Sequence, residues 1–575
     1  MIAKSKYFKA SYLSVCLSVA ALTSGHASAF APLPVVPPVM ACTDLLNIDW
    51  TGVPGAPIKL NSVSVVTANG ANFCYVTGYV APKVRLEMYM PAGWTQRYQF
   101  SGSGGYAGSV SGSGAPLLPT PVLTNNNAVG FPMASSNELV VVFSDLGHAR
   151  AATAFADGFW ALNDPTAIVD FAYTGVHKSV LASKAIVNAY YGQQPRYSYF
   201  NGCSDGGREG LHELQRFPAD FDGAIIGAPV IDEISTNSQW HAYFWRSNQD
   251  SSGRNLLLTS KQPVLRDAVR AACSVRLNDG TLDVLNDFRS CHFDAQTIAS
   301  PTCDPTSSDG CLTPAQATVA NNWWSGVIAN GEHLTPGGAP YGSEFFWGLP
   351  ATPTTPVSTL GDFIFSNDFP NIMASFAAPT GLTGRNLQFT AGEFDLVHAL
   401  TGIYDPTSPD LTAFQARGGK IIFWQGWADS GASPYMLLNY INAMAQQMGT
   451  NTRDSFTKTY MIPGAGHCGA SKDLYSPLLN WVEQGQTPGQ VNVTNIGQGA
   501  RDRPVWPHPS LTVYNPAADS FVQDGPSQNS DLYLWRGLSH YMPSHTTWCS
   551  SKGASTAQQA NLWVMSCGSL RPNTP

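Results

Sequence analysis

Charged residues are scarce in this chain of 575 residues. Lys, Arg, Asp and Glu together make up 12% of it, whereas hydrophobic residues make up 43%. Disordered chains show the opposite balance, so the composition indicates a folded protein. There is no run of lysine and arginine, which argues against a nucleic-acid partner. The sequence also lacks a solenoid-type repeat and a C-x-x-C motif, which argues against a repeat array and against thiol–disulfide exchange.

Long apolar runs are missing too, apart from a short one at the N-terminus. Three lysines (Lys4, Lys6 and Lys9) precede the apolar stretch 12–22, and Ala27-Ser28-Ala29 matches a small-x-small cleavage site. This pattern predicts a secretory signal peptide over residues 1–29, because the apolar stretch is well short of the ~20 residues of a membrane span. An N-terminal anchor is the alternative. After cleavage, 28 basic and 39 acidic residues remain, a net charge of −11. We expect a secreted or periplasmic protein with no membrane partner after cleavage.

The cysteine count agrees with export. Of 11 cysteines, Cys16 lies in the signal and ten remain, an even number suited to an oxidising compartment. The spacing favours four local pairs, which are Cys42–Cys74, Cys273–Cys291, Cys303–Cys311 and Cys549–Cys567. Cys203 and Cys468 then remain without a local partner. Sequence does not fix connectivity, and free buried thiols are the alternative.

Strand and helix patterns alternate along most of the chain. Alternating residues over 60–142 predict β-strands, and short β-branched runs predict buried parallel strands. Later strands are predicted at 138–143, 197–200, 224–226, 420–424 and 456–462, with helices at 167–191 and 208–217. This order indicates an α/β fold around a parallel sheet.

The alternation stops between residues 230 and 400. This stretch holds four cysteines, many prolines and many aromatic residues. We interpret it as a lid domain over the carboxyl edge of the sheet, where α/β folds bind ligands. The predicted organisation is a signal peptide (1–29), a catalytic domain (30–229 and 401–575) and the lid (230–400). Alternatively, the aromatics form only the core of a second domain.

A serine motif follows one predicted strand directly. Ser204 stands in Gly202-Cys203-Ser204-Asp205-Gly206, between a strand and a helix, as a nucleophile elbow requires. An ordinary glycine-rich turn is the alternative. The backbone N–H of Asp205 would then be one oxyanion donor, and a second should come from an earlier glycine-rich loop such as 101–106. That loop lacks the helix and acid of a dinucleotide site.

The acid and the base should follow in the order Ser, Asp, His. Asp429 lies on the loop after the strand at 420–424, and His467 on the loop after the next strand. The Asp429 carboxylate would orient the imidazole, and His467 would activate Ser204. Asp395 and His398 form a competing pair, without a strand-end position.

With these residues in place, the chain resembles the tannase/feruloyl esterase family. The resemblance covers nearly all of the mature chain and rests on Gly202 to Gly210, Gln215-Arg216-Phe217-Pro218, Asp222-Gly223, Gly227-Ala228-Pro229 and Gly464-Ala465-Gly466-His467-Cys468. It implies an α/β-hydrolase fold with a large inserted lid, and a Cys203–Cys468 disulfide beside the triad. It also implies Gly104 as the second oxyanion donor, a Cys42–Cys74 pair, a small aromatic ester as substrate, and no cofactor in the chemistry.

The chain departs from this family at a calcium loop in the lid. The family pattern is C-D-x-x-D-G-x-x-D-G, and the corresponding stretch here is 273–283. Asp279 and Asp283 match, but the first acid is missing and Arg276 lies nearby. Calcium needs several oxygen ligands. The alternatives are a structural calcium at Asp279 and Asp283, or Arg276 paired with these acids in place of the ion.

The second departure concerns the substrate. By the resemblance, a member that acts on a terephthalate monoester holds the free carboxylate with a lid arginine, yet no Arg or Lys occurs between His333 and Gly384. We therefore expect a serine esterase for phenolic acid esters, such as feruloyl or galloyl esters. Terephthalate monoesters or related polyester monomers are the alternative, and a binding protein on an inactive hydrolase scaffold is the non-enzymatic one.

Overall fold

The computed structural model describes most of the predicted mature chain. It covers residues 33–68, 71–110, 138–150, 155–273, 275–376, 379–494 and 502–542, and two strands at 547–551 and 565–569. The predicted signal peptide lies outside the described residues. Among the helices of the described part, none is long and apolar enough to cross a membrane.

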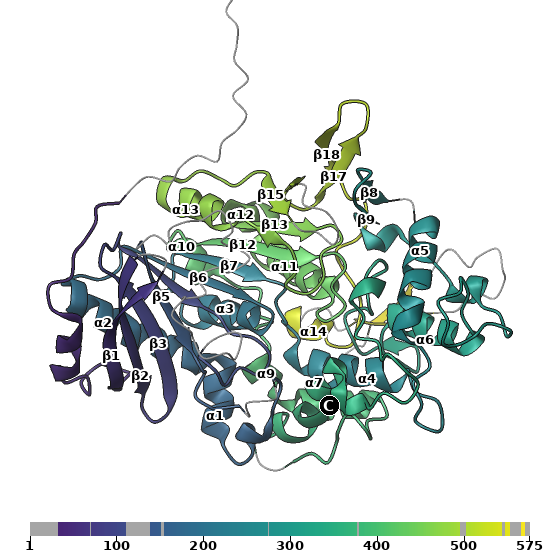
Figure 1. Ribbon diagram of the computed structural model, residues 1–575, viewed down its shortest axis with the longest axis horizontal. Coiled ribbons are helices and arrows are strands. Elements are labelled where there is room, and N and C mark those ends of the chain that lie inside the picture. The colour runs from purple at the N-terminus through teal and green to yellow at the C-terminus, as the bar shows by residue number, and fades with distance from the viewer. Residues whose placement is uncertain are drawn as a thin grey trace, which may run out of the picture.

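A nine-stranded sheet forms the centre of the described structure (Figure 1). Its strand order is β1-β2-β3-β5-β4-β6-β7-β12-β13. Strands β1 to β3 pair antiparallel and join β5, and from β5 to β13 every pair is parallel. The bounds are β1 Ile58–Ala68, β2 Ala71–Val80, β3 Val84–Pro91, β4 Arg97–Ser101, β5 Leu139–Ser144, β6 Tyr197–Cys203, β7 Gly223–Gly227, β12 Lys420–Gly426 and β13 Thr457–Ile462. The predicted α/β fold is confirmed.

Helices cover both faces of this sheet because its strands are apolar on both sides. Along β5, Val140 and Val142 face one hydrophobic core and Leu139 and Val141 face another, as the two-residue period of a strand requires. The first core includes side chains of α2 (Gly175–Tyr191), α3 (Asp205–Arg216) and α11 (Pro434–Met448). The second includes α13 (Tyr475–Gln484). The parallel strands are therefore buried from both sides.

The segment between β7 and β12 contains short helices, and Figure 1 shows those of residues 241–368 on the right, opposite β1–β3. Its centre is aromatic: the Phe244 ring stacks on Trp323 at 3.6 Å between centroids, and Trp347 meets Trp323 edge-on at 5.0 Å. Most of its aromatic residues thus form a core. Its elements are α4 His241–Arg246, α5 Gln262–Ala272, β8 Arg276–Asn278, β9 Asp283–Leu285, α6 Pro314–Ser325, β10 Ile328–Ala329, β11 Glu332–His333, α7 Gly361–Asp368, α8 Ala391–Val397, α9 Thr401–Tyr404 and α10 Thr412–Ala416.

Shorter elements complete the described structure. They are α1 Pro165–Val169, α12 Thr450–Phe456, α14 Leu538–Tyr541, β14 Ser471–Lys472, β15 Val491–Thr494, β16 Arg503–Val505, β17 Ser510–Asn515, β18 Ser520–Pro526, β19 Thr547–Ser551 and β20 Met565–Ser569. The helix predicted at 167–191 is interrupted by a π-helical turn at Asp170–Thr174. The helix predicted to begin at 208 begins at Asp205, directly after Ser204.

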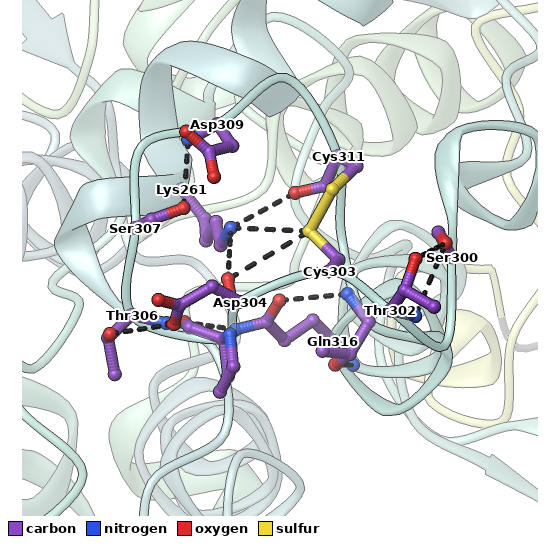
Figure 2. The surroundings of a disulfide bond; sticks show 12 residues. Lys261, Ser300, Thr302, Cys303, Asp304, Thr306, Ser307, Asp309, Cys311 and Gln316 are labelled. Carbon is purple, nitrogen blue, oxygen red and sulfur yellow. Dashed lines mark hydrogen bonds between the residues drawn. A yellow bond between two sulfur atoms is a disulfide. The ribbon is translucent and has the colours of Figure 1, made fainter.

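Disulfides join four of the expected cysteine pairs in the described residues. The Cα–Cα distances are 5.5 Å for Cys42–Cys74, 6.0 Å for Cys203–Cys468, 5.1 Å for Cys273–Cys291 and 6.0 Å for Cys303–Cys311. Figure 2 shows the last of these, where the Lys261 ammonium donates to the carbonyl oxygens of Asp304 (2.8 Å) and Cys311 (3.1 Å). Cys549 stands opposite Cys567 in the register of β19 and β20, and their bond stays a prediction.

Candidate active site

Ser204 occupies a sharp turn between β6 and α3. Its φ is +65°, a left-handed conformation that L-residues rarely adopt and that is common at functional sites. The turn is possible because its neighbours are glycines: a Cβ on Gly206 would lie 2.6 Å from the Ser103 carbonyl oxygen. Its backbone N–H donates to the Gly227 carbonyl at 3.0 Å, which fixes the turn to the next strand, β7.

Three predicted residues from separate strand ends meet at this turn. The His467 Nε2 atom lies 2.7 Å from Ser204 Oγ. The other ring nitrogen, Nδ1, lies 2.8 Å from Asp429 Oδ2. Both distances are those of hydrogen bonds. A nucleophile, a base and an orienting acid are thus arranged in one line, as acyl transfer through a serine requires.

Asp429 is held by four hydrogen bonds in a fully buried position. The backbone N–H groups of Gly431 and Ala432 donate to Oδ1 at 3.0 and 2.9 Å, and the Gln425 amide donates to Oδ2 at 2.7 Å. With the bond from His467, these contacts fix the carboxylate plane toward the imidazole. Gln425 lies on β12 and was not among the sequence-predicted residues.

The carboxylate also controls the charge of the base. Burial lowers the pKa of His467, but the Asp429 carboxylate outweighs it through charge and hydrogen bonding, so the pKa lies above its ordinary value. A neutral imidazole with a raised pKa is a good proton acceptor from a serine hydroxyl.

The loop expected to supply an oxyanion donor lies against α3. Glu209, fully buried on α3, accepts hydrogen bonds from Ser103 N at 3.2 Å and from the Ser103 hydroxyl. Burial and the nearby Asp205 carboxylate raise the pKa of Glu209 well above its usual value. Gly105 and Asp205 both line the cavity at Ser204, and Gly104 stands between Ser103 and Gly105. The glycine-rich loop and the start of α3 are therefore tied together beside Ser204.

A buried arginine neutralises part of a cluster of buried acids near the turn. The acids of this cluster are Asp205, Glu209, Glu233 and Asp405. Arg208 Nε lies 2.5 Å from Asp205 Oδ1, and its Nη1 donates to the carbonyl oxygens of Ala172 and Tyr404 at 2.9 and 3.3 Å. Neither Arg208 nor Glu209 was predicted to have a role. Both belong to the motif on which the family resemblance rests. The sequence feature that could have indicated a role for them is a pair of charged residues among glycines.

A cavity of about 110 Å³ opens at Ser204. The cavity is lined by Ser204 and ten further residues, which are Gly105, Asp205, Val230, Glu233, Thr236, Asn237, His241, Phe365, Gly431 and His467. Residues 230–241 and Phe365 come from the segment that follows β7. A larger cavity of about 390 Å³, lined by Arg266, Arg270 and Phe346 among others, lies beside Gly464 and includes no triad residue in its lining.

The competing pair, Asp395 and His398, is not brought together. The His398 ring contacts the Ser235 hydroxyl at 2.9 Å and the Phe394 carbonyl at 2.6 Å. Asp395 instead pairs with Arg536 at 2.6 Å. Both residues therefore have structural partners.

The two acids of the expected calcium loop have guanidinium partners. Asp279 Oδ2 lies 2.8 Å from both Nε and Nη2 of Arg503, and Asp279 Oδ1 accepts from Thr281 N, Thr281 Oγ1 and Leu282 N at 2.8–2.9 Å. Asp283 Oδ2 lies 3.0 Å from Arg276 Nη1. A calcium ion needs several oxygen ligands, and of these two carboxylates only Asp283 Oδ1 is without a hydrogen-bond partner among the described residues, so the residues as placed do not fit one. The Arg276 pairing was expected, whereas Arg503 was not.

The fold and this site define an α/β-hydrolase. The serine lies at the elbow after β6, the acid follows β12 and the histidine follows β13, so all three stand at the carboxyl ends of parallel strands. A family model described as tannase and feruloyl esterase matches residues 65–526, and the chain belongs to this family of carboxylic ester hydrolases.

Individual relatives agree with this assignment. An esterase of Xanthomonas campestris is 28% identical over 544 residues, covering 82% of this chain and 88% of the relative. The mono(2-hydroxyethyl) terephthalate hydrolase of Piscinibacter sakaiensis is 26% identical over 520 residues, covering 78% and 83%. The crystal structure of feruloyl esterase B from Aspergillus oryzae aligns with a TM-score of 0.67 at 21% identity, covering 84% of this chain and 100% of that one. This last similarity supports the fold.

Proposed function

We propose that the protein is an exported serine esterase that hydrolyses esters of aromatic acids through Ser204, His467 and Asp429. The carrying observation is the pair of hydrogen bonds, 2.7 and 2.8 Å, that links the three side chains at a strained elbow. The family description and the terephthalate-ester relative support an aromatic acyl group. The disulfides support an oxidising compartment, and hence secretion or the periplasm.

The reaction proceeds in two steps. His467 Nε2 takes the hydroxyl proton of Ser204 while Oγ attacks the ester carbonyl carbon. The N–H groups of Gly104 and Asp205 are the proposed donors to the resulting oxyanion. The carbon–oxygen bond to the alcohol then breaks, and His467 returns the proton to the leaving alkoxide. Water, deprotonated by His467, attacks the acyl-enzyme, and the acid leaves as Ser204 regains its proton.

The segment between β7 and β12 has the place of a lid in this proposal. It contributes Val230, Glu233, Thr236, Asn237, His241 and Phe365 to the cavity at Ser204. These side chains would contact the acyl group, because they line the same cavity as Ser204 and His467.

The test compares wild type with Ser204→Ala on methyl ferulate, methyl gallate and a terephthalate monoester. We expect kcat to fall by about 10⁴-fold or more in the variant, with an unchanged circular dichroism spectrum. A fluorophosphonate probe should label wild type and leave Ser204→Ala unlabelled. Hydrolysis retained by the folded variant would contradict the proposal, and an unlabelled, inactive wild type would indicate an inactive scaffold.

A further inference from the structure

One wall of the cavity at Ser204 is polar, and it comes from a single stretch of chain. The polar residues of this wall lie within the nine residues 233–241, which follow β7 and reach the start of α4; they are Glu233, Thr236, Asn237 and His241. Val230 and Phe365 supply the apolar lining. An occupant that matches both parts has a flat apolar body and a hydrogen-bonding group at its edge.

Glu233 is the buried acid of this wall. Its side chain is 2% exposed, and its nearest cation is Arg208, whose Nε lies 4.0 Å from Glu233 Oε2. That same Nε lies only 2.5 Å from Asp205, so the guanidinium is engaged more closely elsewhere. Burial and the Asp205 carboxylate raise the pKa of Glu233 well above its usual value, against the opposing effects of Arg208 and the Asn237 side chain. A buried carboxyl beside a cavity gains from a hydrogen-bonding occupant.

The charges around the cavity disfavour an anionic occupant. Neither lysine nor arginine is among the described residues that line it, whereas Asp205 and Glu233 are. His241 is already paired with Asp362 at 2.7 Å. A ring carboxylate placed here would lie beside two acidic side chains, and no lysine or arginine of the described lining would compensate its charge. A phenolic hydroxyl is neutral and can both donate to and accept from a carboxyl group.

We infer that Glu233 is a specificity-determining residue that binds a ring hydroxyl of the acyl group, with Phe365 against the ring. Glu233 thereby selects hydroxylated aromatic acyl esters over unsubstituted ones and over those with a free ring carboxylate. This inference rests on the proposed function and assigns the substrate discrimination to one side chain. A site that hydrogen-bonds a substrate hydroxyl rejects the analogue without it, because its buried polar group is left unpaired.

Two matched ester pairs test the inference. The first is methyl 4-hydroxycinnamate against methyl cinnamate, and the second is dimethyl against monomethyl terephthalate. In wild type we expect kcat/KM to favour the hydroxylated ester and the neutral diester. In Glu233→Leu the preference for the hydroxylated ester, measured as the ratio of the two kcat/KM values, should fall by about 10- to 100-fold. In Glu233→Gln the preference for the hydroxylated ester should be largely kept, because the amide can still donate to and accept from a ring hydroxyl.

Asp405→Asn is the matched control. Asp405 belongs to the same buried acid cluster and accepts from Ile234 N at 3.3 Å, but it does not line the cavity. Asp405→Asn should keep the wild-type preference within each of the two ester pairs. Equal kcat/KM within both pairs in wild type, or an unchanged preference for the hydroxylated ester in Glu233→Leu, would overturn the inference while leaving the esterase proposal intact. If Glu233→Leu fails to fold, Glu233→Met, which also lacks a hydrogen-bonding group, takes its place. Turnover that survives Ser204→Ala would instead contradict the proposed function itself.

Discussion

Arg503 should contribute substantially to the stability of the protein. It joins Asp279, in the segment between β7 and β12, to strand β16, and both side chains are fully buried. Removing one partner of a buried ion pair costs about 3–5 kcal/mol, because the other charge is left uncompensated. We therefore expect Arg503→Met to lower the free energy of unfolding by about that amount.

The corresponding shift in melting temperature follows from the size of the chain. The unfolding entropy is about 2.1 cal/mol/K per residue, or about 1 kcal/mol per degree for a unit of roughly 500 residues. Arg503→Met should thus melt about 3–5 °C below wild type by differential scanning calorimetry. Arg276→Met is the matched control, since the Arg276–Asp283 pair is about one-third exposed at each side chain. Such a pair contributes about 0–1 kcal/mol, so its melting temperature should change by about 1 °C or less.

Calcium and pH provide two independent checks on Arg503. Excess calcium and EGTA should leave the wild-type melting temperature unchanged. Burial raises the pKa of Asp279, but hydrogen bonds from Thr281 and Leu282 and the Arg503 charge outweigh it, so the pKa is lowered. The stabilisation that the Asp279 carboxylate contributes is therefore fully present above about pH 4, its pKa in the unfolded chain. It is lost as the pH falls through the lower pKa of the folded protein. A calcium-dependent rise for wild type, or an Arg503→Met variant that melts like wild type, would refute the reasoning.

Three further predictions concern the catalytic residues. Asp429→Asn should lower kcat by about 10⁴-fold with little change in melting temperature, because the amide favours the wrong imidazole tautomer; wild-type-like turnover would exclude Asp429 as the orienting acid. In the proposed mechanism neutral His467 is the active form, and its pKa is raised, so kcat/KM should fall with decreasing pH at a value above 6.5; a fall centred below pH 6.5 would contradict this. Mild reduction of Cys203–Cys468 should abolish activity before the far-ultraviolet circular dichroism changes, and simultaneous loss would argue against a positional role.

The triad could be predicted from sequence because each member follows a strand in a recognisable order. Ser204, Asp429 and His467 stand at strand ends, and the parallel sheet brings those ends together. Arg503 could not be predicted in this way. It lies 224 residues from Asp279, and nothing in the spacing of two charged residues that far apart indicates a contact. The sequence therefore suggested Arg276 as the replacement for calcium, which accounts for Asp283 alone.

Buried acids near Ser204 escaped prediction for a related reason. Glu209 and Glu233 are charged residues, and charged residues are mostly found at the surface. Their burial depends on Ser103 and Arg208, which the fold places beside them. Periodicity indicates which residues of a helix face a core, but it does not distinguish a buried acid with partners from an exposed one. Only the three-dimensional arrangement assigned these side chains to the site.

Two of the tethers that fix the turn at Ser204 lie outside the polar wall of the cavity. Cys203 is bonded to Cys468, 265 residues away, which links the elbow to the histidine loop across the whole segment between β7 and β12. Closing so long a loop contributes about 5 kcal/mol at most in chain-entropy models. Its greater effect is positional, because the cysteines adjoin the nucleophile and the base in sequence. Glu209 also fixes the position of the Ser103 loop, by accepting a hydrogen bond from Ser103 N. Since neither tether includes Glu233 or Phe365, substitutions in the wall can change the preferred acyl group without loosening the triad.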